Sequence, residues 1–198
     1  MPVTINGNGS ISGLSVGGLG AGVVNTATLA DGAATGVKQG AGSVIQVLQS
    51  VITDVENTTS ASFAAIPGLS VNITPSATSN KILVTVDLKL GNNSGAGAYI
   101  KLVRNGNTDI YVGDTATDRT PCLHQTYGGG DTGEGLYGMA KMGGTFLDSP
   151  NTTSQVTYAV YWMRMNSATL YTNRCGSETH TQYEGRAASS ITVMEIKG

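Results

Sequence analysis

The chain has 198 residues and a mass of 20.2 kDa, with 28 glycines and only 12% charged residues. This length fits one domain of ordinary size with an appendage, because most domains contain roughly 100 to 150 residues. The net charge of −2 disfavours binding to nucleic acid or to an anionic membrane surface, since both need an excess of positive charge. No stretch approaches the roughly 18 consecutive apolar residues of a membrane-spanning helix, and the N-terminus lacks the pattern of a signal peptide. We therefore expect folding in a cytoplasm, without membrane insertion.

Residues 1–43 differ in composition from the rest of the chain. They hold eleven of the 28 glycines, no aromatic residue and two charged residues, Asp31 and Lys38. Ordering glycine costs much backbone entropy, and this segment has little side-chain area to bury in return. We therefore expect a partner surface to order it, with residues 1–24 as an anchor and residues 25–43 as a Gly/Ala-rich connector. The expected anchor contacts are alternating apolar side chains: Val3, Ile5, Ile11, Leu14, Val16 and Leu19.

From residue 44 onward, apolar and polar residues alternate with a period of two between frequent turn residues, which predicts an all-β domain over residues 44–198. Asn105-Gly106 predicts a tight hairpin, and Asn166-Ser167 predicts a second one. The number and length of the segments predict an antiparallel two-sheet jelly-roll sandwich. The expected strands are 44–53, 63–66, 69–74, 81–90, 98–104, 109–112, 122–127, 136–146, 155–165, 168–173 and 189–196.

The segment 155–165 has large apolar side chains on both faces. Val160 and Trp162 alternate with Tyr161 and Met163. A strand of this kind needs a second buried surface in addition to the core of its own domain. We expect a neighbouring subunit to supply that surface.

Several motifs permit chemistry, and each has a structural alternative. Residues 128–133 satisfy G-x-G-x-x-G, but the glycine-interrupted sequence after them offers no helix for a dinucleotide, so we interpret them as a loop. Cys122 and His124 share a strand face and would suit a thiolate and its base, whereas a packed thiol beside a loop histidine is the structural reading. Cys122 and Cys175 are expected to be free thiols.

Two further groups are polar-loop candidates. Ser177, Glu178 and His180 would suit a hydrolase, but a nucleophile elbow is missing around the serine. Asp114 and Asp118, helped by Asp109 or Asp131, would offer oxygen ligands to calcium, although their spacing matches no calcium loop. We expect surface loops in both places, and therefore no catalytic residue, no cofactor and no bound metal.

Three long polar loops, 92–97, 113–135 and 173–187, carry side chains suited to recognition. Tyrosine offers a rigid apolar face with a polar tip, and arginine donates in pairs to carboxylates. These loops are expected to contact a receptor, a partner or another subunit. The candidate contact residues are Arg119, His124, Tyr127, Asp131, Arg174, His180, Tyr183 and Arg186.

The chain also resembles tail-fibre and fibre-like virion proteins of bacteriophages, notably those of cyanobacteria. The resemblance covers nearly the whole chain and lies in the shared order of short motifs. These are VTINGNGSISGL (3–14), TLADGA (28–33), GSVIQV (42–47), NITP (72–75), SNKILV (79–84), LVRNG (102–106), YVGD (111–114), FLDSP (146–150) and SITVME (190–195).

This resemblance implies a trimeric virion protein, assembled in the bacterial cytoplasm, whose N-terminal residues dock on another virion protein. It also implies a head similar in architecture to complement-type and tumour-necrosis-factor-type heads, with host attachment through a surface glycan or protein. Two other hypotheses remain open. One is a capsid decoration (cement) or head-fibre protein, and the other is a small carbohydrate esterase or lyase. A depolymerase β-helix is disfavoured because the chain has no stacked repeat.

Overall fold

The computed structural model describes residues 4–5, 11–12, 39–94, 97–127 and 136–198. The chain forms two compact units, residues 1–39 and residues 40–198. In the first unit, β1 (Thr4–Ile5) pairs antiparallel with β2 (Ile11–Ser12). Ile5 and Ile11 are partners in this ladder. The other expected anchor residues lie outside the described residues: Val3, Leu14, Val16 and Leu19.

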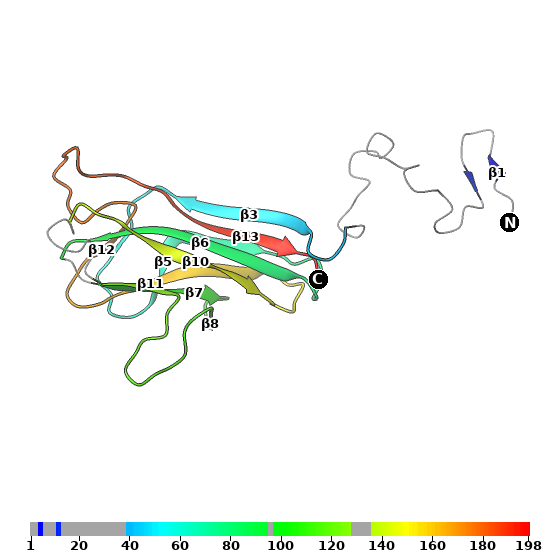
Figure 1. Ribbon diagram of the computed structural model, residues 1–198, viewed down its shortest axis with the longest axis horizontal. Coiled ribbons are helices and arrows are strands. Elements are labelled where there is room, and N and C mark those ends of the chain that lie inside the picture. The colour runs from blue at the N-terminus through cyan, green and yellow to red at the C-terminus, as the bar shows by residue number, and fades with distance from the viewer. Residues whose placement is uncertain (1–3, 6–10, 13–38, 95–96, 128–135) are drawn as a thin grey trace. The chain divides into compact units, whose positions relative to one another are not determined.

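The second unit is a sandwich of two antiparallel sheets (Figure 1). The first sheet contains β3 (Val44–Ile52), β4 (Asn57–Thr58), β6 (Lys81–Asn92), β10 (Ala140–Asp148), β12 (Leu170–Thr172) and β13 (Ser189–Ile196). The second contains β5 (Ala64–Ile73), β7 (Ala98–Arg104), β8 (Thr108–Ile110), β9 (His124–Thr126) and β11 (Val156–Arg164). Below they are called the β6 sheet and the β11 sheet.

The order of the long strands is that of a jelly roll. The β6 sheet runs β3-β13-β6-β10, because β6 pairs with β13 along one edge and with β10 along the other. The β11 sheet runs β5-β11-β7-β8, with β9 beside β7. The chain therefore crosses from one sheet to the other after most long strands, and the described residues contain no helix. This confirms the predicted all-β, two-sheet fold.

Two turn predictions have different outcomes. Asn105 and Gly106 both have positive φ, 52° and 76°, and join β7 to β8 in the predicted hairpin. The hairpin predicted at Asn166-Ser167 is wrong, because the strands on either side of it belong to different sheets. Asn166 still has a positive φ of 55°, so its turn serves a crossover.

The strands predicted at 63–66 and 69–74 are one strand, β5. Its pairing with β11 is regular on both sides of an irregularity that spans Pro67 and Gly68. Proline cannot donate to a ladder and Gly68 has a φ of +72°, so the extra residues bulge out while the strand continues. The sequence signals were therefore correct for a local interruption, but not for the end of a strand.

The core lies between the two sheets. Alternate residues of β6 and β13 point into it, including Val84, Leu88 and Val193, each 0% exposed. From the β11 sheet, Tyr158 and Trp162 contribute the two largest fully buried side chains, at 0% and 1% exposure. Their large apolar surfaces account for much of the stability of the sandwich, since burying such side chains is favourable by about 25 cal/mol per Å².

One buried polar cluster ties the two sheets together. Asp148 on β10 accepts two hydrogen bonds from Arg104 Nη1, at 2.9 and 2.7 Å, and one from the Tyr158 hydroxyl at 2.6 Å. Arg104 lies on β7 and Tyr158 on β11, so the contact joins β10 to both strands. Burial, followed by the hydrogen bond to Asp148, raises the pKa of Tyr158 above its ordinary value and keeps the hydroxyl protonated as a donor.

A second buried carboxylate lies near the end of β13. Glu195 is 0% exposed and accepts hydrogen bonds from Asn80 Nδ2 at 2.5 Å, Gln46 Nε2 at 2.6 Å, and the Ser76 amide and hydroxyl at 2.6 and 2.8 Å. Burial alone would raise the pKa of Glu195, but these donors outweigh it and hold the pKa below 4.5, its ordinary value. The cluster fixes β13 to β3 and to the turn before β6.

We predict that Glu195 makes the stability of the head depend on pH below 4.5. Because its pKa is lower in the folded state, the charged carboxylate stabilises the fold above the ordinary pKa of 4.5, and this contribution is lost as the pH falls below that value. Glu195→Gln should destabilise the head by about 2 to 4 kcal/mol at pH 7, because charge-assisted hydrogen bonds are lost. Urea unfolding from pH 7 to pH 3 measures both effects. An equal acid dependence in wild type and variant would contradict the prediction.

Candidate recognition site and assembly surface

The two ends of the head differ in what the chain does there. At one end the chain enters β3 and leaves β13, where the Gly42 amide donates to Lys197 O at 2.8 Å and the Lys197 amide donates to Ser43 O at 2.9 Å. At the other end, the loop 173–187 precedes β13 (Figure 1). The eight residues of β13 separate the two ends by roughly 24 Å, at about 3.4 Å per residue. We call these the terminal end and the loop end.

The base of the loop 173–187 is pinned by Asn173, which is 0% exposed and has a φ of +59°. Its side-chain amide donates to Ile52 O and Asp54 O, both at 2.9 Å, and its oxygen accepts from the Ser189 hydroxyl at 2.6 Å. The Ala187 amide also donates to Asn173 O at 3.0 Å. Both ends of the loop are therefore held against the sheet.

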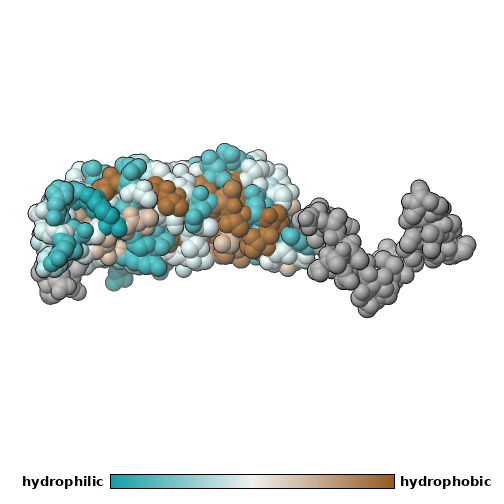
Figure 2. Space-filling view, turned by 90° about the horizontal axis from the view of Figure 1, so that it is seen from above, coloured by the Kyte–Doolittle hydropathy of each residue, from teal (hydrophilic) through white to brown (hydrophobic). Residues whose placement is uncertain are grey.

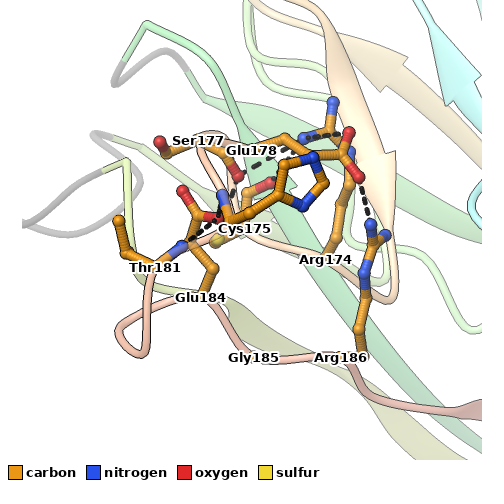
Figure 3. A pocket seen from close by; sticks show the side chains of 9 residues that line it. Arg174, Cys175, Ser177, Glu178, Thr181, Glu184, Gly185 and Arg186 are labelled. Atoms are coloured by element: carbon orange, nitrogen blue, oxygen red, sulfur yellow. Dashed lines mark hydrogen bonds and ion pairs between the residues drawn. The ribbon is translucent and has the colours of Figure 1, made fainter.

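Two arginines face each other just above this base. Arg174 and Arg186 form an antiparallel β-bridge, so their backbones place like charges side by side. Glu178 compensates for both: one carboxylate oxygen lies 3.3 Å from Arg174 Nη1, and the other pairs with Arg186 Nη2 (Figure 3). Like charges directly opposite each other in a β-pair are destabilising, and Glu178 offsets part of that penalty.

A second carboxylate shapes the tip of the loop. Glu184 accepts hydrogen bonds from the Thr179 amide at 2.7 Å, the Thr179 hydroxyl at 2.8 Å, the His180 amide at 2.6 Å and the Thr181 amide at 3.3 Å. These donors, the Thr179 amide foremost, lower the pKa of Glu184 to about 2. His180 has a φ of +62°, which the tight turn around this carboxylate requires.

The loop encloses a small cavity of about 90 Å³ (Figure 3). Arg174, the innermost of its charged side chains, is 9% exposed and stacks on the Tyr171 ring at 3.6 Å from guanidinium carbon to ring centroid. The cavity is lined by Arg174, Cys175, Ser177, Glu178, His180, Thr181, Glu184, Gly185 and Arg186. Three of the eight predicted contact residues, Arg174, His180 and Arg186, thus meet in one place.

Exposed aromatic side chains lie in this loop and beside it. Tyr183 is 68% exposed and meets the Tyr137 ring edge-on, with centroids 6.2 Å apart. Tyr137 is 44% exposed, and its neighbour Leu136 accepts a hydrogen bond from the Ser177 amide at 2.7 Å. The loop end therefore combines arginine, histidine and tyrosine side chains, a composition suited to binding sugars or polar protein surfaces.

The other predicted contact residues do not join this cluster. Arg119 is exposed in a tight turn closed by a bridge with Ala116, and His124 lies on β9 with its Nδ1 at 3.4 Å from the Gly143 amide. Tyr127 is 68% exposed at the end of β9. Asp131 lies outside the described residues.

The catalytic and metal alternatives gain no geometric support. Burial raises the pKa of the Cys122 thiol, which disfavours a reactive thiolate, and the His124 ring lies against the Gly143 backbone. Ser177 and His180 do line one cavity, but both oxygens of Glu178 pair with arginines. Within residues 39–94, 97–127 and 136–198, no three His, Cys, Asp or Glu side chains form a group that could hold a metal ion.

The outward face of the β6 sheet is a different kind of surface. Val47, Met194, Leu83 and Leu147 are successive partners across β3, β13, β6 and β10. Val47 and Leu147 are 52% and 43% exposed. The adjacent row is uncharged as well, and consists of Gln49, Thr192, Thr85 and Thr145. We call these two rows the uncharged face.

Apolar surface gathers toward the end of the sandwich where β3 begins (Figure 2). Val44, Val47 and Val51 are all among the exposed large hydrophobic residues of the head. On the β11 sheet, the outward Tyr161 and Met163 are only half-buried within one chain. The most exposed apolar row therefore lies on the sheet opposite to the one that the sequence argument singled out.

Sequence reasoning missed Glu184, which holds the tip of the loop 173–187, and Tyr137, which comes from a separate loop. It named Glu178 only in a possible hydrolase group, whereas the structure places this carboxylate between two arginines. A signal for Asn173 was present, since asparagine is among the few residues that readily adopt positive φ. The carboxylate contacts had no signal, because they join loop residues at irregular spacings. Comparison with protein-family models and with curated proteins gives no match to this chain.

We predict that Glu184→Gln loosens the loop while leaving the sandwich intact. A glutamine amide cannot accept from all four donors, so the His180 and Thr179 amides should exchange with solvent at least tenfold faster. Exchange at Ile191 and Val193 in β13 is the internal control and should not change. Hydrogen exchange followed by NMR measures both sets. Unchanged protection of the His180 amide in the variant would show that Glu184 does not hold the loop.

Proposed function

We propose that the chain is a structural virion protein of the bacteriophage tail-fibre type. It is a homotrimer whose residues 1–43 dock on another virion protein, and its β-sandwich head attaches to a glycan or protein on the host surface. The observation that carries the proposal is the separation of the two ends of the head. The chain enters and leaves at the terminal end, while the arginine- and tyrosine-bearing loop 173–187 lies at the loop end.

This arrangement suits attachment because a head tethered by its terminal end leaves its loop end free to meet a surface. Weak contacts of single loops are then multiplied by the number of copies on the particle. Tyrosine and arginine are also the side chains most enriched at recognition surfaces. The loop is pinned at its base by Asn173, so little conformational entropy is lost there on binding.

The uncharged face supports association of copies. Four strands about 4.8 Å apart and two alternate residues along each strand give it an area of roughly 260 Å². A stable complex buries roughly 800 Å² per partner, so this face alone supplies about a third of what is needed. Each chain must then use a second surface as well. A closed ring, in which the face of one chain contacts another surface of the next, meets this requirement.

We predict that the full-length protein competes with virions for the host. Purified chain added to host cells at saturation should lower virion adsorption at least tenfold, because it occupies the same receptors. Tyr183→Ala should compete less well, since Tyr183 is 68% exposed in the same loop as the arginine pair. Ser154→Ala, in the exposed loop between β10 and β11, is the control and should compete like wild type. Counting unadsorbed virions measures the effect. Full adsorption in the presence of excess protein would favour a capsid decoration or head-fibre role instead.

A further inference from the structure

The two arginines at the loop end share a single carboxylate partner. Arg174 and Arg186 bring two positive charges together, and Glu178 is the acidic side chain that pairs with them. Glu184 is held by four donors of its own loop and pairs with neither arginine, although its charge faces the same cavity. The four charged side chains of the lining therefore balance while Glu178 is in place, and a positive charge is left facing the cavity once Glu178 moves away.

The hydrogen bonds of Arg174 are long. Its Nη1 lies 3.3 Å from Glu178 Oε2, 3.3 Å from Cys175 O and 3.4 Å from Ser177 O. Guanidinium–carboxylate bonds are normally about 2.7 to 2.9 Å, so Glu178 satisfies this arginine poorly. Among the described residues, Arg174 Nε is also a buried donor without a partner, on a side chain that is only 10% exposed. An anion placed closer to Arg174 would form the short hydrogen bonds that Glu178 does not form.

The Glu178 side chain has room to move away from the arginine pair. Its side chain is 42% exposed, and it lies in the loop rather than on a strand. The position it occupies shows what the arginine pair accepts, because each of its two oxygens contacts one arginine (Figure 3). That is the geometry of a carboxylate bridging two guanidinium groups.

The size of the cavity limits which group of a ligand can enter it. About 90 Å³ corresponds to roughly three water molecules at about 30 Å³ each, which accommodates a carboxylate group but not a whole sugar ring. The ring would remain outside, where Tyr183 of this loop and its neighbour Tyr137 are exposed. Aromatic faces are suited to the apolar side of a sugar ring.

We propose that the Arg174–Arg186 pair binds the carboxylate of an acidic sugar, and that Glu178 occupies this position in the free protein until the sugar displaces it. The proposal rests on the attachment function above and names the class of host-surface ligand. Binding breaks the Glu178 contacts and forms equivalent ones to the sugar, so the exchange needs no net change in the charge of the arginines.

The test is titration calorimetry of the full-length protein with a galacturonate oligosaccharide and with a neutral malto-oligosaccharide of equal length. Glu178→Gln removes the competing charge and should bind the acidic sugar about tenfold more tightly than wild type. Arg186→Gln should weaken that binding at least tenfold. Asp118→Asn is the matched control: it changes the net charge as Glu178→Gln does, but in an exposed loop away from the cavity, and it should bind like wild type.

Three results would overturn the proposal. They are equal affinity of wild type and Glu178→Gln for the acidic sugar, equal affinity of wild type for the neutral sugar, or tighter binding of a hexaglutamate peptide than of the sugar. Melting curves check that each variant folds, and if Glu178→Gln does not fold, Arg186→Gln decides alone because its side chain is 55% exposed. Competition with virion adsorption in the absence of any acidic-sugar preference would refute this inference while leaving the attachment function standing.

Discussion

The uncharged face of the β6 sheet places the main constraint on this molecule. In a sandwich each sheet buries one face against the other and usually presents charged or polar side chains on the second. Here the inward row of the four strands is apolar, and the outward row of Val47, Met194, Leu83 and Leu147 is apolar too. Two charge-free rows side by side have the composition of an interface core, where charged residues are depleted. A neighbouring copy that covers them would complete the burial that one chain begins.

Covering that face has consequences for the rest of the head. β13 lies between β3 and β6, and Glu195 fixes the C-terminal end of β13 to β3 and to the turn before β6. If the copies form a closed ring about an axis along β13, their β13 strands share one orientation, with all chain ends on one side and all 173–187 loops on the other. Such an array presents several arginine pairs to one surface, which is the geometry that multivalent binding requires.

The sequence predicted those parts of the fold that follow from local patterns. Alternation in β6 and β13 revealed both strands, and Asn105-Gly106 revealed its hairpin, because these signals act over a few residues. The interruption at Pro67-Gly68 was misread as a strand end. A bulge within a strand and the end of a strand give the same sequence signal when the partner strand is not known. The sequence predicted three contact residues, Arg174, His180 and Arg186, without indicating that they lie together. Their meeting around Glu178 depends on a β-bridge and on side-chain contacts across an irregular loop, for which no periodic pattern exists.

The most direct test of this account is the mass of the purified full-length protein in solution, measured by sedimentation and by native mass spectrometry. We expect an oligomer of three chains. Val47→Lys should reduce this to single chains, because it places a charge on the uncharged face at its most exposed apolar position, on the edge strand β3. Ser70→Lys, which adds the same charge on an exposed position of β5 in the other sheet, should leave three chains together. A wild-type protein that sediments as a single folded chain at micromolar concentration would contradict the account.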